Sequence, residues 1–192
     1  MRHQLLRLVA VVGCGVVAAN SAAADNTSRV AAGYEHTCAL TPDGTVLCWG
    51  YNASGQLGDG TTTNRSTPAV VSGLPNGVAL AVAAGGYHTC ALTPEGGVVC
   101  WGDNFFGQLG DGTTDPRSVP VTTGIGVGAA SVVGGYWHTC ALMAEGSVFC
   151  WGLNSSGQLG DGTTTSAATP RPSPLADVGV ERLVVVPSPS WP

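Results

Sequence analysis

Charged residues are scarce in this sequence, and lysine is absent altogether. Asp, Glu, Lys and Arg make up 10% of the 192 residues, whereas 44% are hydrophobic. Low charge combined with this much apolar surface argues against a disordered chain, and the length is sufficient for one domain with a buried core. The 29 glycines and the short apolar runs favour an all-β fold with tight turns.

The N-terminal segment has the pattern of an export signal. Two arginines accompany an apolar stretch at residues 8–19, which is short for a membrane span, and three alanines end at Ala24. We therefore predict a signal peptide over residues 1–24, helical and cleaved near Ala24, and a mature chain without a transmembrane span. The predicted location is secreted, periplasmic or at the cell surface. Because VVGC, ending at Cys14, resembles a bacterial lipobox, a lipoprotein anchored at Cys14 is an alternative.

Positive charge is too sparse and too scattered to form a basic surface. Without residues 1–24, five arginines face twelve acidic residues, which is a net charge of −7. The five are Arg29, Arg65, Arg117, Arg171 and Arg182. Binding to a phosphate backbone requires clustered positive charge, so the sequence indicates no nucleic-acid partner.

Six of the seven cysteines form three pairs, each with partners ten positions apart. The pairs are Cys38 with Cys48, Cys90 with Cys100, and Cys140 with Cys150. Regular, even pairing in an exported chain predicts disulfides. Zinc is the alternative, but the C-x9-C spacing does not match the usual ligand spacings.

The ten-residue spacing follows from the register of a β-hairpin. In HTCALTPDGTVLCWG, a loop at residues 42–44 would be closed by Thr41 opposite Thr45. Counting outward places Cys38 opposite Cys48 at a non-hydrogen-bonded pair. There the Cα atoms lie about 4.5 Å apart, which a disulfide accepts.

The stretch CALTPDGTVLCWGYNASGQLGDG, which begins at Cys38, is repeated with few changes from Cys90 and from Cys140. Repeats about 50 residues apart are typical of propellers and solenoids. Further strands are predicted at Thr67–Val71 and Val78–Gly85, so that each repeat would contain about four short strands, the number in a propeller blade.

The repeated segments AL, G.V, WG.N and GQLG.G resemble the repeat of the regulator of chromosome condensation family, and the cysteines match its exported bacterial type. The resemblance covers roughly Val30–Pro172. It implies a β-propeller, which in this family closes with about seven blades. We therefore expect an all-β partial β-propeller of three four-stranded blades, preceded by the signal helix.

The expected domain boundaries follow from the repeats. Residues 25–182 hold three repeats, at about 30–81, 82–131 and 132–181, and residues 183–192 are the truncated start of a fourth repeat or an irregular tail. Three blades cannot close a ring, so their open faces are expected to promote self-association. A truncated gene product is the other explanation of the short repeat number.

One histidine recurs in each repeat, as His36, His88 and His138. Three imidazoles could hold a metal in a propeller channel. The alternative, which repetition favours, is a histidine that hydrogen-bonds the neighbouring blade or turn in the same way each time. The Asp-Gly turns that begin at Asp59, Asp111 and Asp161 lack the ligand series of a calcium loop, and no nucleophile–base pair is evident.

Positions that vary between the repeats are better candidates for binding. Aromatic residues occupy several of them, and aromatic residues on loops of a rigid scaffold are common binding anchors. The candidates are Tyr34, Tyr87, Phe105, Phe106, Tyr136 and Trp137. Packing between blades is the alternative role for each of them.

The resemblance also implies an activity, because the founder of the family is a nucleotide-exchange factor that binds chromatin. An exported, acidic chain does not fit that role. We predict instead a non-enzymatic, exported module, without cofactor or metal, that binds a protein or a cell-surface ligand. A small-GTPase exchange regulator and a non-functional truncated fragment are the alternatives.

Overall fold

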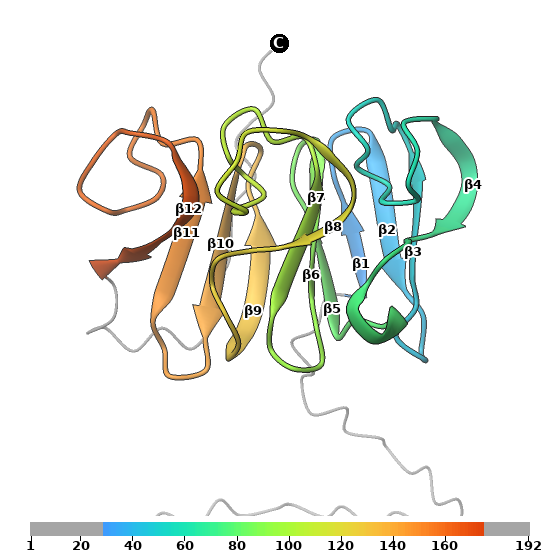
Figure 1. The fold of residues 1–192 in the computed structure, drawn as a ribbon, viewed down its shortest axis with the longest axis horizontal. Coiled ribbons are helices and arrows are strands. Elements are labelled where there is room, and N and C mark those ends of the chain that lie inside the picture. The colour runs from blue at the N-terminus through green and yellow to red at the C-terminus, as the bar shows by residue number, and fades with distance from the viewer. Residues whose placement is uncertain (1–28, 175–192) are drawn as a thin grey trace, which may run out of the picture.

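Three four-stranded antiparallel sheets stand side by side in the computed structural model, which describes residues 29–174 (Figure 1). The first sheet contains β1 (Val30–Ala32), β2 (His36–Leu40), β3 (Val46–Gly50) and β4 (Arg65–Val70). The second contains β5 (Ala81–Ala84), β6 (His88–Leu92), β7 (Val98–Gly102) and β8 (Arg117–Thr122). The third contains β9 (Ala129–Gly134), β10 (His138–Met143), β11 (Val148–Gly152) and β12 (Ala167–Ser173). This confirms the predicted all-β fold with three four-stranded blades.

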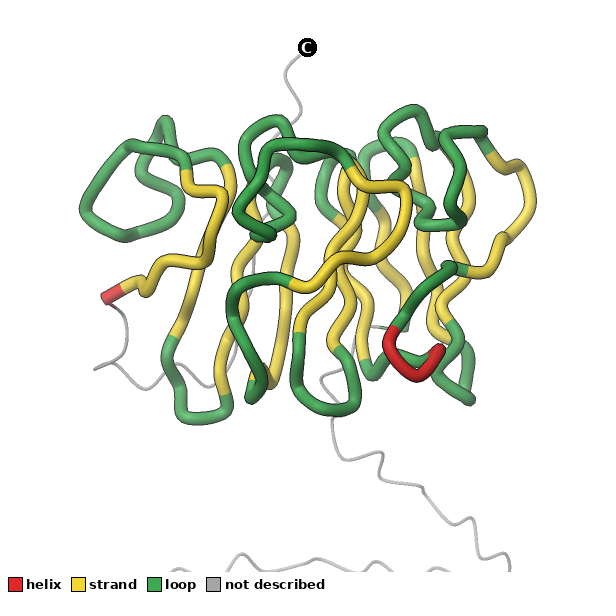
Figure 2. The backbone as a smooth tube through the Cα atoms, in the orientation of Figure 1, coloured by secondary structure: helices red, strands yellow, loops and turns green. Residues whose placement is uncertain are grey.

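Each sheet uses its strands in chain order, from an inner to an outer edge. The inner strand β5 lies beside both β1 and β9, as expected where blades surround a common axis. The long loops after β3, β7 and β11 lie at one end, and the tight turns between β2 and β3, β6 and β7, and β10 and β11 lie at the other (Figure 2). Within residues 29–174, no helix has the length and apolarity needed to cross a membrane. The predicted signal helix, Cys14 and residues 183–192 lie outside the described residues.

The hairpin register agrees with the prediction. Leu40 is opposite Val46 and Cys38 is opposite Cys48. The Thr41 N–H donates to the Thr45 carbonyl at 2.9 Å, which closes the turn. All three predicted disulfides are formed, each with its Cα atoms 4.1 Å apart.

One predicted strand is shorter than expected. The strand predicted at Val78–Gly85 is observed only at Ala81–Ala84. A 3-10 turn at Pro75–Gly77 precedes it, and the Ala79 N–H donates to the Gly44 carbonyl of the preceding hairpin turn at 2.8 Å. The start of the segment therefore ties two blades together instead of extending the sheet.

The hydrophobic core lies between neighbouring sheets. Val46 and Leu57 of the first repeat pack in one buried cluster with Val82 and Trp101 of the second. Trp101 and Trp151 have no exposed surface. A single sheet cannot bury both of its faces, so each blade depends on its neighbour for stability.

The loop after β3 is built around one asparagine. The Asn52 amide nitrogen donates to the Thr61 and Thr63 carbonyls at 3.1 and 3.0 Å, and its oxygen accepts the Leu57 N–H at 2.9 Å. The Asp59 carboxylate accepts from Arg65 at 2.8 Å. The same bonds recur at Asn104 and Asn154. These Asp-Gly segments are thus ordinary turns whose carboxylates are already engaged.

The central disulfide provides a test of the hairpin. We expect that replacing both Cys90 and Cys100 with alanine lowers the free energy of unfolding by up to about 3 kcal/mol, because each bridge closes a short loop. The fold itself should persist, since ladder bonds and Trp101 packing hold the hairpin. Denaturant unfolding under non-reducing conditions measures the difference, and equal stability of variant and parent would contradict the bridge.

Candidate binding site

The structure brings all six aromatic candidates into one connected group at the end of the molecule that carries the long loops. Tyr51, which was not among the predicted residues, joins them. We call this group the aromatic cluster, and its members are Tyr34, Tyr51, Tyr87, Phe105, Phe106, Tyr136 and Trp137. Each ring lies within 6.1 Å of another, measured between ring centroids.

Three tyrosines from three blades form its centre. The ring of Tyr34 lies 5.6 Å from Tyr87 and 5.7 Å from Tyr136, and the last two are 5.9 Å apart. All three pairs are edge-to-face, which is a favourable arrangement for aromatic rings. The centre is therefore a packed contact between blades as well as a surface feature.

Backbone hydrogen bonds set the positions of the turns that carry these tyrosines. The Tyr34 N–H donates to the Gly86 carbonyl at 3.1 Å, and the Gly86 N–H donates to the Tyr136 carbonyl at 2.9 Å. A Cβ atom on Gly86 would lie 3.0 Å from the Tyr136 ring. The absence of a side chain at Gly86 thus leaves room for the ring of the next blade.

A second part of the aromatic cluster extends from Tyr136 to the loop after β7. The Trp137 ring lies 4.5 Å from Tyr136 and 5.5 Å from Phe106, and Phe106 lies 4.9 Å from Phe105. Tyr34 is 57% exposed, Phe105 73% and Trp137 36%. Inner members therefore pack between blades, while these three present apolar surface to solvent.

Tyr51 follows the WG of the first repeat, at a position held by Asp103 and Leu153 in the others. Its N–H donates to the Glu35 carbonyl at 2.8 Å, and its ring lies 6.1 Å from Tyr87. Variation between repeats was the signal that could have identified it.

The pKa of Tyr87 is raised to about 12. The main cause is the removal of its side chain from water within the aromatic cluster, and the second is its hydrogen bond with the Tyr136 side chain. The phenol of Tyr87 therefore stays neutral.

Two of the three recurring histidines, His36 and His88, have a different role, in contacts between blades. His36 Nε2 lies 2.9 Å from the Thr89 hydroxyl of the next blade, and that hydroxyl donates to the backbone carbonyl of Gln56 at 2.8 Å. Trp101 Nε1 donates to the same carbonyl at 3.0 Å. We call this set, with its histidine, threonine, glutamine carbonyl and tryptophan, the interblade cluster.

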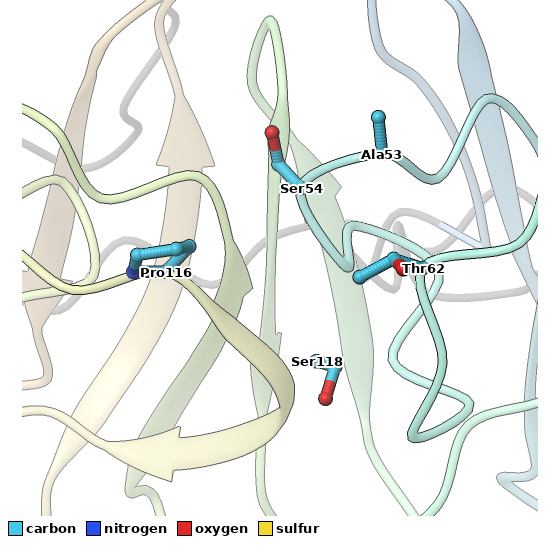
Figure 3. A pocket seen from close by; sticks show the side chains of 5 residues that line it. All are labelled: Ala53, Ser54, Thr62, Pro116 and Ser118. Atoms are coloured by element: carbon cyan, nitrogen blue, oxygen red, sulfur yellow. The ribbon is translucent and has the colours of Figure 1, made fainter.

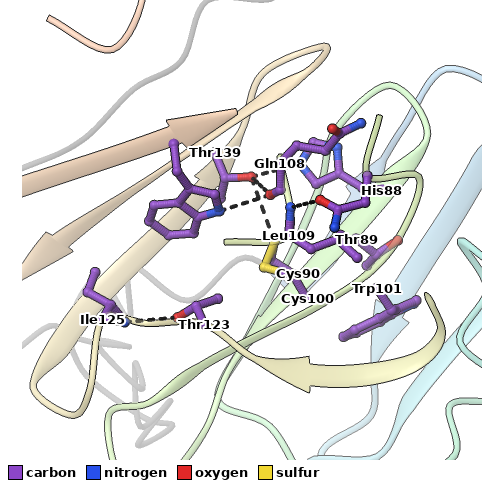
Figure 4. The surroundings of a disulfide bond; sticks show 12 residues. His88, Thr89, Cys90, Cys100, Trp101, Gln108, Leu109, Thr123, Ile125 and Thr139 are labelled. Atoms are coloured by element: carbon purple, nitrogen blue, oxygen red, sulfur yellow. Dashed lines mark hydrogen bonds between the residues drawn. A yellow bond between two sulfur atoms is a disulfide. The ribbon is translucent and has the colours of Figure 1, made fainter. Parts of the chain in front are cut away.

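The interblade cluster recurs between the second and third blades. His88 Nε2 lies 2.9 Å from the Thr139 hydroxyl, and the Gln108 carbonyl accepts from Thr139 and from Trp151, both at 2.9 Å. Figure 4 shows Thr139 beside Gln108 and near the Cys90–Cys100 disulfide. The expectation that the histidines bond the neighbouring blade is confirmed for these two.

The bonding pattern also determines the histidine tautomer. Because the Thr89 hydroxyl hydrogen points to the Gln56 carbonyl, His36 must donate from Nε2. Its Nδ1 atom is then unprotonated. Among residues 29–174 this atom is buried without a hydrogen-bond partner, and so is Nδ1 of His88. Burial lowers the pKa of His36 to about 4 and that of His88 to about 3.

A small hollow lies at the edge of the first loop. Its volume is about 150 Å³, and Ala53, Ser54, Thr62, Pro116 and Ser118 line it (Figure 3). Small-molecule sites usually occupy at least about 300 Å³, so this hollow is small for one. A second hollow, of about 300 Å³, lies at the opposite end, between the hairpin turn at residues 41–44 and residues 78–80. Within residues 29–174, no three His, Cys, Asp or Glu side chains are grouped as metal ligands.

A family model described as the regulator of chromosome condensation (RCC1) repeat matches residues 43–92, 95–142 and 145–182, which is well over half of the chain. The chain belongs to this family. A second model of the RCC1 repeat matches residues 28–56, 80–108 and 129–158. The match to residues 43–92 begins in a hairpin turn of one blade and ends in the next, so it contains both Gln56 and Thr89. The RCC1 repeat thus spans an interface between blades.

Similar proteins agree with this membership. The probable E3 ubiquitin-protein ligase HERC4 of Homo sapiens is 44% identical over 93 residues, which is 48% of this chain and 9% of HERC4. The RCC2 homolog of Danio rerio is 42% identical over 88 residues, or 45% of this chain and 18% of that protein. The chain therefore spans less than a fifth of the length of these curated relatives.

Solved structures show the same architecture. Human WBSCR16 has a TM-score of 0.70 and 31% identity, over 79% of this chain and 38% of WBSCR16. Prp20p of Saccharomyces cerevisiae has a TM-score of 0.67 and 23% identity, over 74% of this chain and 37% of Prp20p, which shows the fold alone. RCC1-repeat propellers serve binding or regulation rather than catalysis.

The three disulfides indicate an oxidising environment.

The buried histidines predict that this RCC1-repeat protein loses stability in mild acid. Below the ordinary histidine pKa of 6.5, the unfolded chain binds protons that the folded chain excludes until pH about 4 at His36 and about 3 at His88. The free energy of unfolding is therefore highest above pH 6.5 and falls as the pH decreases. Between about pH 6.5 and 4.5 the loss should be on the order of 2–3 kcal/mol per histidine.

Denaturant unfolding at about pH 7.5 and about pH 4.5 measures this loss. His88→Gln should reduce the difference between the two pH values, because glutamine does not titrate. His138→Gln is the matched control. Burial lowers the pKa of His138 as well, but this side chain is only half-buried, so the variant should retain most of the difference. An unchanged pH dependence in His88→Gln would contradict the assignment.

Proposed function

We propose that this chain is a non-enzymatic, exported propeller module that binds a protein or a cell-surface ligand through its aromatic cluster. The observation that carries the proposal is the convergence of aromatic side chains from separate turns onto one surface, with Tyr34, Phe105 and Trp137 exposed. Exposed aromatic residues on a rigid framework bind partners at a small cost in conformational entropy.

The charged groups support a protein partner rather than a nucleic acid. Arg65, Arg117 and Arg171 each pair with an aspartate of their own loop, at 2.8, 3.0 and 2.9 Å. These three guanidinium groups hold the loops in shape, and each belongs to the outer strand of a different blade. The whole chain has a net charge of −5, which would repel the negatively charged phosphate backbone of a nucleic acid.

The aromatic surface has a preferred chemistry. Faces of tyrosine, phenylalanine and tryptophan bind proline rings and cationic side chains, and Glu35 lies exposed in the turn beside Tyr34. We therefore propose that the recognised segment is rich in proline or arginine. This chain matches only 9% of HERC4 and 18% of the RCC2 homolog, so the proposal does not extend to the activities of those whole proteins.

A displayed peptide library selected against the protein tests the proposal. We expect enriched proline- or arginine-containing peptides that lose affinity at least about tenfold in the double variant Phe105→Ala with Trp137→Ala, because two exposed anchors are removed. Val127→Ala is the matched control, since Val127 is 71% exposed near the hairpin turns at the opposite end. If the parent and the double variant bound the selected peptides with equal affinity, the result would contradict the proposal.

An exchange regulator of a small GTPase remains the alternative function. Prp20p, which shares the fold, was described with its binding properties to Gsp1p and histones. An oxidising compartment argues against such a partner, because disulfides are rare in the cytosol where these GTPases act. Accelerated nucleotide release from Gsp1p in the presence of this chain would favour the alternative over the proposed module.

Export predicts a specific mass for the mature protein. When the chain is expressed with residues 1–24 in a host that has an export pathway, the product should begin at Asp25. Its mass should be six hydrogens below that of the reduced form, because three disulfides form. A lipid-modified product starting at Cys14 would support the lipoprotein alternative, and an uncleaved product with free thiols would contradict export.

A further inference from the structure

We propose that two copies of this chain dock head to tail, with the first blade of one copy completing the interblade cluster of the third blade of the other. The described residues end in two sheets that have a neighbour on one side only (Figure 1). Each of these outer faces presents one half of the set of groups that joins the blades internally.

The first blade presents the donor half. Thr37 and Trp49 occupy the positions of Thr89 and Trp101. Thr89 and Trp101 are fully buried, and both donate to the Gln56 carbonyl of the preceding blade. Thr37 and Trp49 are only partly buried, and their hydroxyl and indole N–H have no hydrogen-bond partner among the described residues.

The third blade presents the acceptor half, which is named for its glutamine backbone carbonyl and also carries a histidine. His138 and Gln158 correspond to His88 and Gln108, but they are half-buried instead of fully buried. No side-chain hydrogen bond joins His138 to any part of the described chain. The backbone carbonyl of Gln158 is thus available to accept a threonine hydroxyl, as the backbone carbonyl of Gln108 accepts that of Thr139.

Shape complementarity follows the same pattern. A Cβ atom on Gly58 would lie 2.6 Å from the Trp101 indole nitrogen, and one on Gly110 would lie 2.7 Å from that of Trp151. The third such glycine, Gly160, has only the Ser173 side chain near it. At Gly58 and Gly110 a tryptophan of the next blade fills the space beside the glycine, whereas no tryptophan fills the space beside Gly160. Trp49, in turn, does not pack against such a glycine.

A backbone hydrogen bond would be added at the outer strand. The Gly60 N–H donates to the Ser118 carbonyl at 3.0 Å, and the Gly112 N–H donates to the Ala168 carbonyl at 2.9 Å. The equivalent donor of the third blade is Gly162, and the equivalent carbonyl of the first blade is that of Ser66. Head-to-tail docking would bring these two groups together.

A second copy is a better occupant than the segments outside residues 29–174. Inside the chain, the hydroxyl and the indole are twelve positions apart, as Thr89 is from Trp101. Residues 1–28 contain no tryptophan, and the hydroxyls of residues 175–192, at Ser188 and Ser190, are within three positions of Trp191, so neither segment carries this pair at facing positions of a hairpin. The first blade of another copy carries Thr37 and Trp49 at the spacing used twice inside the chain. The resulting interface is heterologous, so a dimer keeps one donor face and one acceptor face open for further addition.

Sedimentation equilibrium of the 192-residue chain over a wide concentration range tests the proposal. We expect reversible association beginning with a dimer. The donor-face variant Thr37→Val with Trp49→Phe and the acceptor-face variant His138→Ala should each weaken association, by about tenfold or more for the donor-face variant, because buried polar groups lose their partners. Thr122→Val, at an exposed position of β8, is the matched control and should associate like the parent.

Mixing the two interface variants distinguishes head-to-tail docking from other arrangements. The intact acceptor face of one variant and the intact donor face of the other should form a heterodimer with affinity close to that of the parent, and nothing larger. Near-ultraviolet circular dichroism should show that both variants remain folded. A parent that stays monomeric, variants without effect, a mixture that does not associate, or association abolished by Trp137→Ala alone would each overturn the proposal.

Discussion

The structure depends on two backbone carbonyl oxygens, those of Gln56 and Gln108, which join one blade to the next. Each accepts a threonine hydroxyl and an indole N–H from the following blade. Both interactions are buried, where an unpaired carbonyl would be costly. Since a single sheet cannot bury both of its faces, these contacts hold together the apolar surfaces that stabilise the three blades.

The aromatic cluster is a consequence of the same spacing between blades. Turns from successive blades are held in contact by the bonds of Gly86 to Tyr34 and Tyr136, so side chains far apart in sequence share one surface. Residues of the interblade cluster must repeat, because each contact repeats. Turn residues are free to differ, and at these positions Tyr51, Phe105 and Trp137 supply a surface that does not recur from blade to blade within residues 29–174.

Local features were predictable because they depend on neighbours in sequence. The turn at residues 42–44 sets the register that places Cys38 opposite Cys48, and ladder counting needs no information from elsewhere. The strand predicted at Val78–Gly85 was too long because the Ala79 N–H bonds to Gly44 in another blade. Thr89 and Gln56 were overlooked as partners because 33 residues separate them.

The sequence by itself determined the all-β class, the number of repeats, the cysteine pairing and the six aromatic candidates. These properties follow from composition, period and hairpin register. Only the tertiary structure decided that the candidates form one group with Tyr51, and that His36 and His88 bond threonines of the next blade. The reason is physical: contacts between blades depend on how sheets pack, and the period of a repeat does not specify that packing.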